Sequence, residues 1–372
     1  MTHGLDLLVL LTDGFGGHGG IAKFNRDFLQ ALDACAPVER VYVLPRLIPQ
    51  PIEEAIPEAV VYDRKAATGR LAFLRRLASH TWRYERIDLV VCGHLHLLPA
   101  AWLVARLRGA RLALIIHGIE AWAPSKRLVA NRLAHRVDAI IAVSHHSAEQ
   151  FARWSKVPIE QAFILPNCVD LDTFQPQPRD PALLERYGLK AHKVILTVGR
   201  LASAERHKGF DEVIELMPPL LKRFPDLKYL IVGEGDDRPR LEAKADSYRV
   251  ANHVIFTGQI PEREKVAHYN LADAFVMPST WEGFGIVLIE AAACGVPVIG
   301  SRIDGSREAL RDGLLGRLVD PRKPEEFVEA VTAVLRNPSS RARADGIDMF
   351  SIQNFRARVA EWCRMQVGHA AA

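Results

Sequence analysis

The chain has 372 residues, the length of two globular domains of ordinary size. Its 49% hydrophobic and 25% charged residues are typical of a soluble protein, and no apolar run reaches the roughly 18 residues that span a bilayer. The net charge of +4 is unevenly placed, because residues 1–168 hold 20 Lys and Arg against 15 Asp and Glu, whereas the remainder holds 28 against 29.

The first apolar run, Leu5 to Leu11, is short and lacks a basic leader, so we interpret it as a first strand and not as a signal peptide. The five cysteines have no paired spacing, which argues against a disulfide or zinc framework. Together these features predict a protein of the reducing cytoplasm.

Apolar runs typical of strands alternate with runs typical of helices, a pattern that predicts an α/β protein with doubly wound parallel sheets. In the first half we expect strands at Asp6–Thr12, Arg40–Leu44, Leu89–Cys92, Ala110–Ile116 and Ala139–Val143, and helices such as Ile21–Ala34 and Pro99–Arg108. In the second half we expect strands at Val194–Val198, Tyr229–Val232, Val254–Thr257, Ala274–Met277 and Val296–Gly300, followed by a helix at Pro324–Arg336.

A segment rich in Pro, Asp and Gln, Pro166 to Pro181, separates the two series and predicts a linker. We therefore expect one domain over residues 1–168, a second over 169–350, and a terminal segment over 351–372 that forms a helix. Ligands of doubly wound sheets bind beyond the carboxyl ends of the strands, so these ends are where we expect the functional residues.

The most informative stretch runs from Glu282 to Glu290 and reads Glu-Gly-Phe-Gly-Ile-Val-Leu-Ile-Glu. It predicts a glycine-bearing loop that opens a helix, and such loops bind anions through backbone amides. We expect Glu282 in the loop and Glu290 about two turns inside the helix, on the same side, because eight residues are close to two helical turns. A phosphate flanked by hydroxyl groups, as in a nucleotide sugar, suits this layout; the alternative is one capping acid and one solvated acid.

This stretch resembles the E-x7-E motif of retaining glycosyltransferases of family 4, which have the GT-B fold of two Rossmann-like domains facing a cleft. Further segments match the family in the same order: Gly16–Gly20, Pro166–Asp170, Val198–Leu201, Lys208–Gly209, Ile231–Gly235 and Phe256–Gly258. The match is more specific in the C-terminal half. It implies an N-terminal acceptor domain, a C-terminal nucleotide-sugar domain and a terminal helix that crosses back to the first domain.

The resemblance implies that Arg200 and Lys208 bind the diphosphate of the nucleotide-sugar donor. Arg206 is a competing candidate for this role, because residues 204–207 lengthen the usual loop. Fixed cations there stabilise the charge that grows on the leaving diphosphate. It also implies that Glu290 accepts hydrogen bonds from the ribose and that Glu282 holds hydroxyls of the transferred sugar.

We expect backbone amides of the glycine loop to contact the phosphate and the sugar of the nucleotide-sugar donor. The other positions expected to contact this nucleotide sugar lie just after strand ends. These positions are Gly16, Gly17, Gly199, Gly258, Ile260, Phe284, Gly285 and Ile286. Glu262 is placed to face the base, and a carboxylate pairs with the two adjacent N–H donors of guanine. This favours GDP-mannose over UDP-glucose.

His117 follows a predicted strand, and the family carries a histidine in this loop, so we expect it to contact the sugar or to help the acceptor lose its proton. The alternative is a histidine that caps a backbone group. A glutamate near the anomeric carbon could act as a nucleophile, but the family implies front-face attack with the leaving phosphate as base. Asp170-Leu171-Asp172 lies in the linker, so we expect no metal and no cofactor.

Residues 64–86 carry seven basic residues and one acidic residue, which favours an anionic membrane surface over nucleic acid, for which no motif is present. The apolar residues Leu71, Leu74, Leu77 and Ala78 recur at helical spacing, with Phe73 and Trp82 expected at the edges of that face. The basic residues expected at the membrane are Arg70, Arg75, Arg76 and Arg83. The alternative is a helix packed on the core with a solvated basic face.

Taken together, the sequence predicts a retaining hexosyltransferase that moves a sugar, mannose being favoured, from a nucleotide sugar to a lipid-linked glycan or glycolipid in cell-surface polysaccharide biosynthesis. We expect it to be peripheral on the inner face of the cytoplasmic membrane. The alternatives are a nucleotide-sugar epimerase of the same architecture and a non-catalytic nucleotide-sugar-binding protein.

Overall fold

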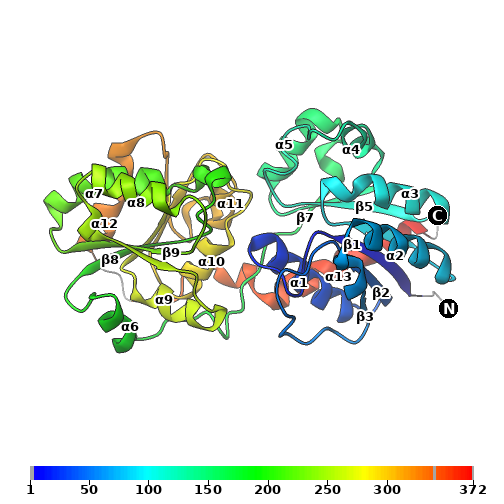
Figure 1. Cartoon of the computed structure of the whole chain (residues 1–372), viewed down its shortest axis with the longest axis horizontal. Helices are drawn as coiled ribbons and strands as arrows, with labels where there is room; N and C mark the ends of the chain where they lie inside the picture. The colour runs from blue at the N-terminus through cyan, green and yellow to red at the C-terminus, as the bar shows by residue number, and fades with distance from the viewer. Residues whose placement is uncertain (1–3, 338–340, 371–372) are drawn as a thin grey trace. The chain divides into compact units, whose positions relative to one another are not determined.

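The computed structural model describes residues 4–337 and 341–370. The chain divides into two compact units, one formed by the residues up to Cys168 together with those from Ile352 onward, and the other by Val169–Ser351. Each unit is built on one parallel β-sheet flanked by helices (Figure 1).

The first sheet has seven parallel strands in the order β3-β2-β1-β4-β5-β6-β7. The strands are β1 (Leu5–Leu11), β2 (Val38–Pro45), β3 (Val60–Tyr62), β4 (Leu89–Cys92), β5 (Arg111–Ile116), β6 (Ala139–Ala142) and β7 (Ala162–Ile164). The central strands are apolar on both faces because helices cover both sides, and Leu7 to Leu11 are fully buried. The strand order reverses at β1, so the carboxyl ends of β1 and β4 mark the switch point of this sheet.

The α-helices of the first unit are α1 (Gly20–Asp33), α2 (Arg70–Arg83), α3 (Leu98–Arg108), α4 (Leu128–Leu133), α5 (His145–Ser155) and α13 (Ile352–Ala370). The terminal helix α13 packs against α1 through aromatic rings. Phe355 meets Phe24 edge-on at 5.8 Å between ring centroids, and Trp362, only 1% exposed, lies 5.8 Å from Phe28. Aromatic burial of this size stabilises strongly, which explains why the C-terminal helix belongs to the first unit.

The second sheet has six parallel strands in the order β10-β9-β8-β11-β12-β13. They are β8 (Lys193–Val198), β9 (Leu227–Val232), β10 (Val254–Gly258), β11 (Ala274–Met277), β12 (Val298–Ser301) and β13 (Arg317–Val319). The α-helices are α6 (Pro181–Arg186), α7 (Phe210–Arg223), α8 (Arg238–Ser247), α9 (Lys265–Leu271), α10 (Ile286–Ala293), α11 (Ser306–Ala309) and α12 (Pro324–Arg336). Here the strand order reverses between β8 and β11.

All the strands expected from the sequence are present, each within about two residues of its predicted bounds. Three strands were missed, β3, β7 and β13. Each has three residues and lies at the edge of its sheet. An edge strand pairs on one side only and can be short, so it leaves little apolar signal in the sequence.

Candidate functional site

The loop after β8 carries Arg200 and Lys208, the two residues predicted to bind the donor diphosphate, which we call the clamp. Arg200 directly follows Gly199, and Lys208 ends the short 3₁₀ segment Ser203–Lys208 that precedes α7. The backbone is packed tightly here, because a Cβ on Gly233 would lie 1.9 Å from the carbonyl oxygen of Gly199. The strand ends therefore fix where the loop starts, while the Arg200 side chain is 69% exposed.

The loop between β11 and α10 is held by one buried carboxylate, Asp304. It accepts hydrogen bonds from Ser279 Oγ at 2.7 Å, the Glu282 amide at 2.9 Å and the Ser306 amide at 3.0 Å. Burial raises the pKa of Asp304 to about 6, although these hydrogen bonds act to lower it. The Gly305 amide in turn donates to the Glu282 carbonyl at 2.8 Å, so the backbone that carries Glu282 is fixed from both sides.

The two loops meet at the carboxyl edge of the second sheet. The Thr280 amide donates to the His207 carbonyl at 2.9 Å, and Lys208 Nζ lies 3.6 Å from Glu282 Oε2. Arg200 pairs with Glu205, whose carboxylate is also 3.6 Å from Lys208 Nζ. The structure thus brings Arg200, Lys208 and Glu282 into one charged cluster.

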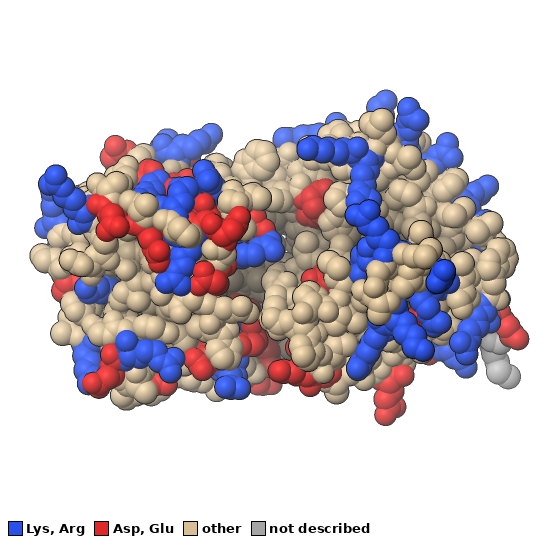
Figure 2. Space-filling view, viewed as in Figure 1, with Lys and Arg blue, Asp and Glu red and all other residues tan. Residues whose placement is uncertain are grey.

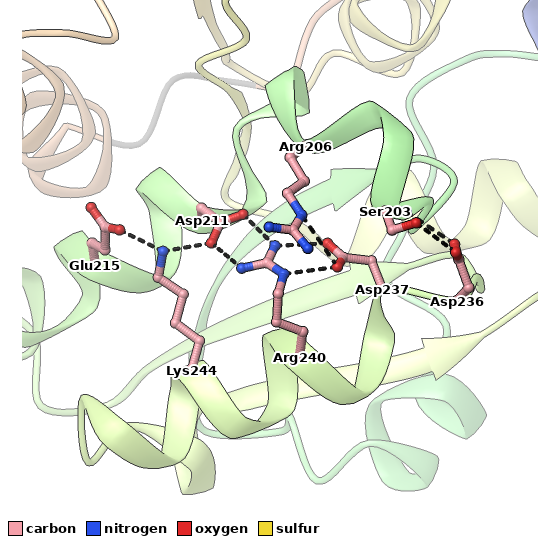
Figure 3. Close-up of polar contacts among 8 residues, drawn as sticks. All are labelled: Ser203, Arg206, Asp211, Glu215, Asp236, Asp237, Arg240 and Lys244. Atoms are coloured by element: carbon pink, nitrogen blue, oxygen red, sulfur yellow. Dashed lines mark hydrogen bonds and ion pairs between the residues drawn. The ribbon is translucent and has the colours of Figure 1, made fainter.

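Arg206, the competing clamp candidate, lies outside that cluster. Its Nε is 3.6 Å from Asp237, which also pairs with Arg240 at 2.7 Å. Figure 3 shows Arg206 in an ion-pair network over α7 and α8, in which Arg240 binds Asp211 through two hydrogen bonds of 2.6 Å. Burial raises the pKa of Asp211, but Arg240 and Lys244 outweigh it and leave that pKa below its usual value. Arg206 therefore anchors the loop to α8.

The position of Glu290 within its helix differs from the prediction. Glu282 lies in the loop, as predicted, but α10 begins only at Ile286, after Gly285 at a φ of 86°, so Glu290 lies little more than one turn inside the helix and not two. Glu290 is fully buried, and its carboxylate accepts a hydrogen bond of 2.7 Å from the Tyr269 hydroxyl and pairs with Lys265 at 3.0 Å.

Lys265 and Tyr269 were missed by sequence reasoning. They lie four residues apart on α9, and Lys265 also contacts Glu262 at 3.2 Å, so Glu262, Lys265 and Glu290 form a continuous chain of charges. Burial lowers the pKa of Lys265, but Glu290 and Glu262 outweigh burial and leave it raised. The spacing of Lys265 and Tyr269 was a signal for one helix face, but the sequence did not indicate that this face meets Glu290.

The start of α10 is suited to an anion. Among the described residues no side chain caps its N-terminus, and the amides of the first turn of a helix lack partners within the helix. Phe284 is buried and meets Phe350 edge-on at 5.4 Å, so its side chain anchors the loop. Gly258 ends β10 with a φ of 76°, and Ile260 is half-buried just before Glu262.

At the carboxyl edge of the first sheet, His117 is a neutral imidazole. Its Nε2 lies 3.2 Å from the Gly93 carbonyl, which only accepts, so Nε2 carries the hydrogen and Nδ1 is an acceptor. Burial lowers the pKa of His117 to about 4, with the Gly93 carbonyl opposing it. Glu120 accepts the His117 and Gly118 amides at 2.7 and 3.0 Å and fixes the loop.

The glycine loop before α1 is tied down by its neighbours. Gly16 has a φ of 78°, and a Cβ there would lie 2.5 Å from the Gln50 carbonyl oxygen. The Gln50 amide donates to the Gly16 carbonyl at 3.0 Å, and the Arg26 guanidinium donates to the carbonyls of Gly14 and Gly17 at 3.2 and 2.9 Å. Gly16 thus allows close backbone approach, and Gly17 leaves room for the side chains of Asp13 and Ala22.

The structure divides the predicted apolar face of α2 between two sides of the helix. Phe73 and Leu77 are buried against the core, whereas Leu71, Leu74 and Trp82 are 60%, 56% and 66% exposed. The helix therefore packs on the sheet by one side and presents a separate apolar stripe to solvent. The basic residues divide likewise: Arg70, Arg75 and Arg83 are exposed, while Arg76 is partly buried and pairs with Asp63 at 2.5 Å.

In the linker, Asp170 accepts hydrogen bonds from the Asp172 amide at 3.0 Å and from Thr173 Oγ1 at 2.7 Å. It shapes a turn, as expected for a structural residue. The part of the chain that the structure describes holds no group of three metal-ligating side chains and no helix with the length and hydropathy of a membrane span.

Two family models match the chain. The model described as Glycosyltransferase Family 4 matches residues 18–173, and the model described as Glycosyl transferases group 1 matches residues 184–346. Among solved structures, Anabaena HepE in complex with UDP and glucose has a TM-score of 0.75 at 20% identity, covering 97% of this chain and all of that one. The sucrose-phosphate synthase of Thermosynechococcus elongatus has a TM-score of 0.74 at 21% identity, covering 98% of each chain. At this identity the likeness establishes the fold.

The GDP-mannose-dependent alpha-(1-6)-phosphatidylinositol monomannoside mannosyltransferase of Mycolicibacterium smegmatis is 37% identical over 66% of this chain and 66% of its own length. The phosphatidyl-myo-inositol mannosyltransferase of Mycobacterium tuberculosis H37Rv is 35% identical over 51% of this chain and 50% of its own length. The matches thus span between half and two thirds of these relatives. With the two family models and the GT-B fold, they place the chain in glycosyltransferase family 4.

Proposed function

We propose that the protein is a retaining hexosyltransferase that moves mannose from GDP-mannose to a lipid-linked acceptor, with the donor bound by the second unit. The charged cluster of Arg200, Lys208 and Glu282 carries this proposal. Cations fixed at the carboxyl edge of the sheet stabilise the negative charge that develops on a departing diphosphate. The carboxylate beside Lys208 is suited to the hydroxyls of the sugar that is transferred.

The chemistry follows from these positions. The bond from the anomeric carbon to the diphosphate breaks as the acceptor hydroxyl attacks the same face, and the leaving phosphate oxygen takes the acceptor proton. Lys208 and Arg200 then hold the nucleoside diphosphate product. In this proposal Glu282, which lies 3.6 Å from Lys208, binds the hydroxyls of the sugar, and attack from the same face needs no covalent intermediate.

GDP-mannose is favoured by the named relatives and by the chain of charges from Glu262 through Lys265 to Glu290. In this arrangement Glu290 binds the ribose hydroxyls. The Glu262 side chain is 72% exposed and can pair with the two adjacent N–H donors of guanine.

The first unit is proposed to bind the acceptor. The neutral His117 offers Nδ1 as an acceptor for a hydroxyl hydrogen, because Nε2 is already bound to the Gly93 carbonyl. A cationic imidazole carries hydrogens on both nitrogens and could not accept a hydrogen bond from the acceptor hydroxyl. Burial lowers the pKa of His117 and so favours the neutral imidazole, which can accept one.

A lipid acceptor requires the protein to reach a membrane surface, and the outer face of α2, α3 and α4 is suited to one. It exposes apolar side chains from each helix: Leu71, Leu74, Trp82, Leu103, Leu107, Leu128 and Val129. Residues 64–84 contain no Asp or Glu, and between residues 89 and 137 Glu120 is the only one. Figure 2 shows Lys and Arg side chains gathered over this unit. Apolar insertion and attraction to anionic lipid would act together here.

The deciding experiment is incubation of the protein with GDP-mannose and phosphatidylinositol mannoside in mixed vesicles. Release of GDP with mannosylation of the lipid, and an α-linkage by NMR, is the expected result. Conversion of the sugar without transfer would identify an epimerase, and binding without turnover would identify a non-catalytic binding protein. We also expect full activity in excess chelator, because the two cations perform the role that a metal ion has in other glycosyltransferases. A strict need for magnesium or manganese would contradict this part of the proposal.

A further inference from the structure

The two cations assigned to the donor diphosphate already have an anionic partner within the chain. Glu205 pairs with Arg200, and its other carboxylate oxygen lies 3.6 Å from Lys208 Nζ. Although Glu205 belongs to a surface loop, its side chain is only 18% exposed. One carboxylate thus bridges both cations where the proposed function requires them to face a diphosphate.

The loop holds Glu205 in this position from both sides. Ser203 binds Asp236 through its amide at 2.9 Å and through its hydroxyl at 2.6 Å, and Arg206 pairs with Asp237. Figure 3 shows both contacts, which attach the loop to the N-terminal end of α8. Between these anchors the backbone kinks at Glu205, with φ −122° and ψ 36°. Because its neighbours are attached to α8, the backbone of Glu205 is held beside the two cations.

A diphosphate and this carboxylate cannot both occupy the same two cations at full strength. A donor that arrives must either displace Glu205, which costs its ion pairs, or bind beside it and meet a like charge. We propose that Glu205 is an internal counter-ion that competes with the donor diphosphate and sets the affinity of the site for nucleoside diphosphates. The inference rests on the proposed role of Arg200 and Lys208.

The competition also has a use in the reaction cycle. After transfer, the nucleoside diphosphate releases to solvent the proton that its terminal phosphate took from the acceptor. It then carries more negative charge than the donor did and would be held more tightly by the same cations. Glu205 can pair with Arg200 and Lys208 again as the product leaves, so it favours release of the product over retention.

The test is the affinity of the parent protein and of Glu205→Gln for GDP and for UDP, measured by isothermal titration calorimetry. We expect Glu205→Gln to bind both roughly fivefold more tightly, the range expected for an ion pair that is partly exposed. Glu215→Gln is the matched control, because it makes the same charge change in a glutamate that pairs with Lys244 and not with the clamp. Guanosine, which has no phosphate, should bind parent and variant equally.

A double-mutant cycle identifies the partner. In a Lys208→Ala background the gain from Glu205→Gln should shrink, because one of the two contested cations is absent. Equal or weaker binding of GDP by Glu205→Gln, with an unchanged melting temperature, would overturn the inference and make Glu205 a residue that positions the clamp. A parent and variants that all fail to bind GDP and UDP would overturn the proposed function itself. A gain of equal size for guanosine would show that the effect does not act through the phosphates, and an equal gain in Glu215→Gln would show that net charge is the cause; either result would overturn competition for the two cations.

Discussion

The two units share a doubly wound scaffold but present different chemistry at the carboxyl edges of their sheets. In the second unit the exposed cation Arg200 lies beside Lys208 and Glu282, and the buried Asp304 fixes the loop that carries Glu282. In the first unit burial lowers the pKa of His117, and the charged side chain beside it, Glu120, is bound to backbone amides. A pair of cations suits a leaving diphosphate, and a neutral imidazole suits a hydroxyl acceptor, so the fold alone does not decide the chemistry.

Breaking the buried ion pair of Glu290 and Lys265 should have the largest effect, because it should lower both stability and activity. Glu290→Ala leaves Lys265 without its main partner, so we expect a loss of about 3 kcal/mol in the free energy of unfolding and a loss of turnover. Urea denaturation of the parent and the variant measures this. Glu329→Ala, which breaks the exposed pair with Arg223, is the control and should leave stability unchanged. Equal stability of Glu290→Ala and parent would show that the pair is not a structural anchor.

Substitutions in the clamp should lower activity without lowering stability. Arg200→Ala and Lys208→Ala are each expected to lower turnover roughly 100-fold, because a charged contact to a transition state contributes about 3 kcal/mol. Stability should be retained, since the Arg200 side chain is mostly exposed. Steady-state kinetics with donor and lipid acceptor give the measurement, with Arg223→Ala as the matched control. Near-normal turnover in either variant would remove that residue from the site.

The outer face of the first unit should give a smaller, salt-dependent effect on membrane binding. Changing the exposed Arg70, Arg75 and Arg83 to glutamine is expected to weaken binding to anionic vesicles in sedimentation assays by roughly 100-fold, at about 1 kcal/mol for each arginine. Binding should also fall as salt rises. Arg76→Gln is the internal control, because Arg76 is paired with Asp63.

Donor binding by this triple variant should be unchanged, and activity should fall more on a lipid acceptor than on a soluble one. Vesicle binding equal to that of the parent would show that α2 only packs on the core.

The smallest expected effect is on the pH dependence of stability, to which the carboxyl edges of the two sheets contribute with opposite sign. The folded pKa of His117 is about 4, below its ordinary value of 6.5, so unfolding takes up a proton at mildly acid pH and stability is lost as the pH falls from 6.5 toward 4. At pH 5 this amounts to about 2 kcal/mol, and His117→Gln should lose correspondingly less stability between pH 7 and pH 5.

Asp304 should make stability depend on pH in the opposite sense to His117. Its folded pKa of about 6 lies above the ordinary 3.8, so its contribution to stability falls as the pH rises from 4 to 6. Asp304→Asn should remove that slope. Unfolding curves at several pH values that are the same for His117→Gln and the parent would show that the imidazole is not kept neutral by the fold.

The sequence by itself determined the parts of the protein whose signal is local. Central strands of parallel sheets are buried on both faces, so their apolar runs were found, whereas the edge strands β3, β7 and β13 were not. The run from Glu282 to Glu290 carried the family resemblance and the glycine loop that opens α10. In all these cases neighbouring residues fix the outcome, through periodicity or through the backbone freedom of glycine.

Only the tertiary structure decided which distant side chains meet. It paired Glu290 with Lys265 and Tyr269 from another helix, placed Glu205 between the clamp cations, and moved Arg206 to α8. It also divided the apolar residues of α2 into a packed side and an exposed stripe, which helical spacing could not do because both sides carry leucine. Such pairings depend on contacts between elements far apart in the chain, and a single sequence does not record which element will cover which face.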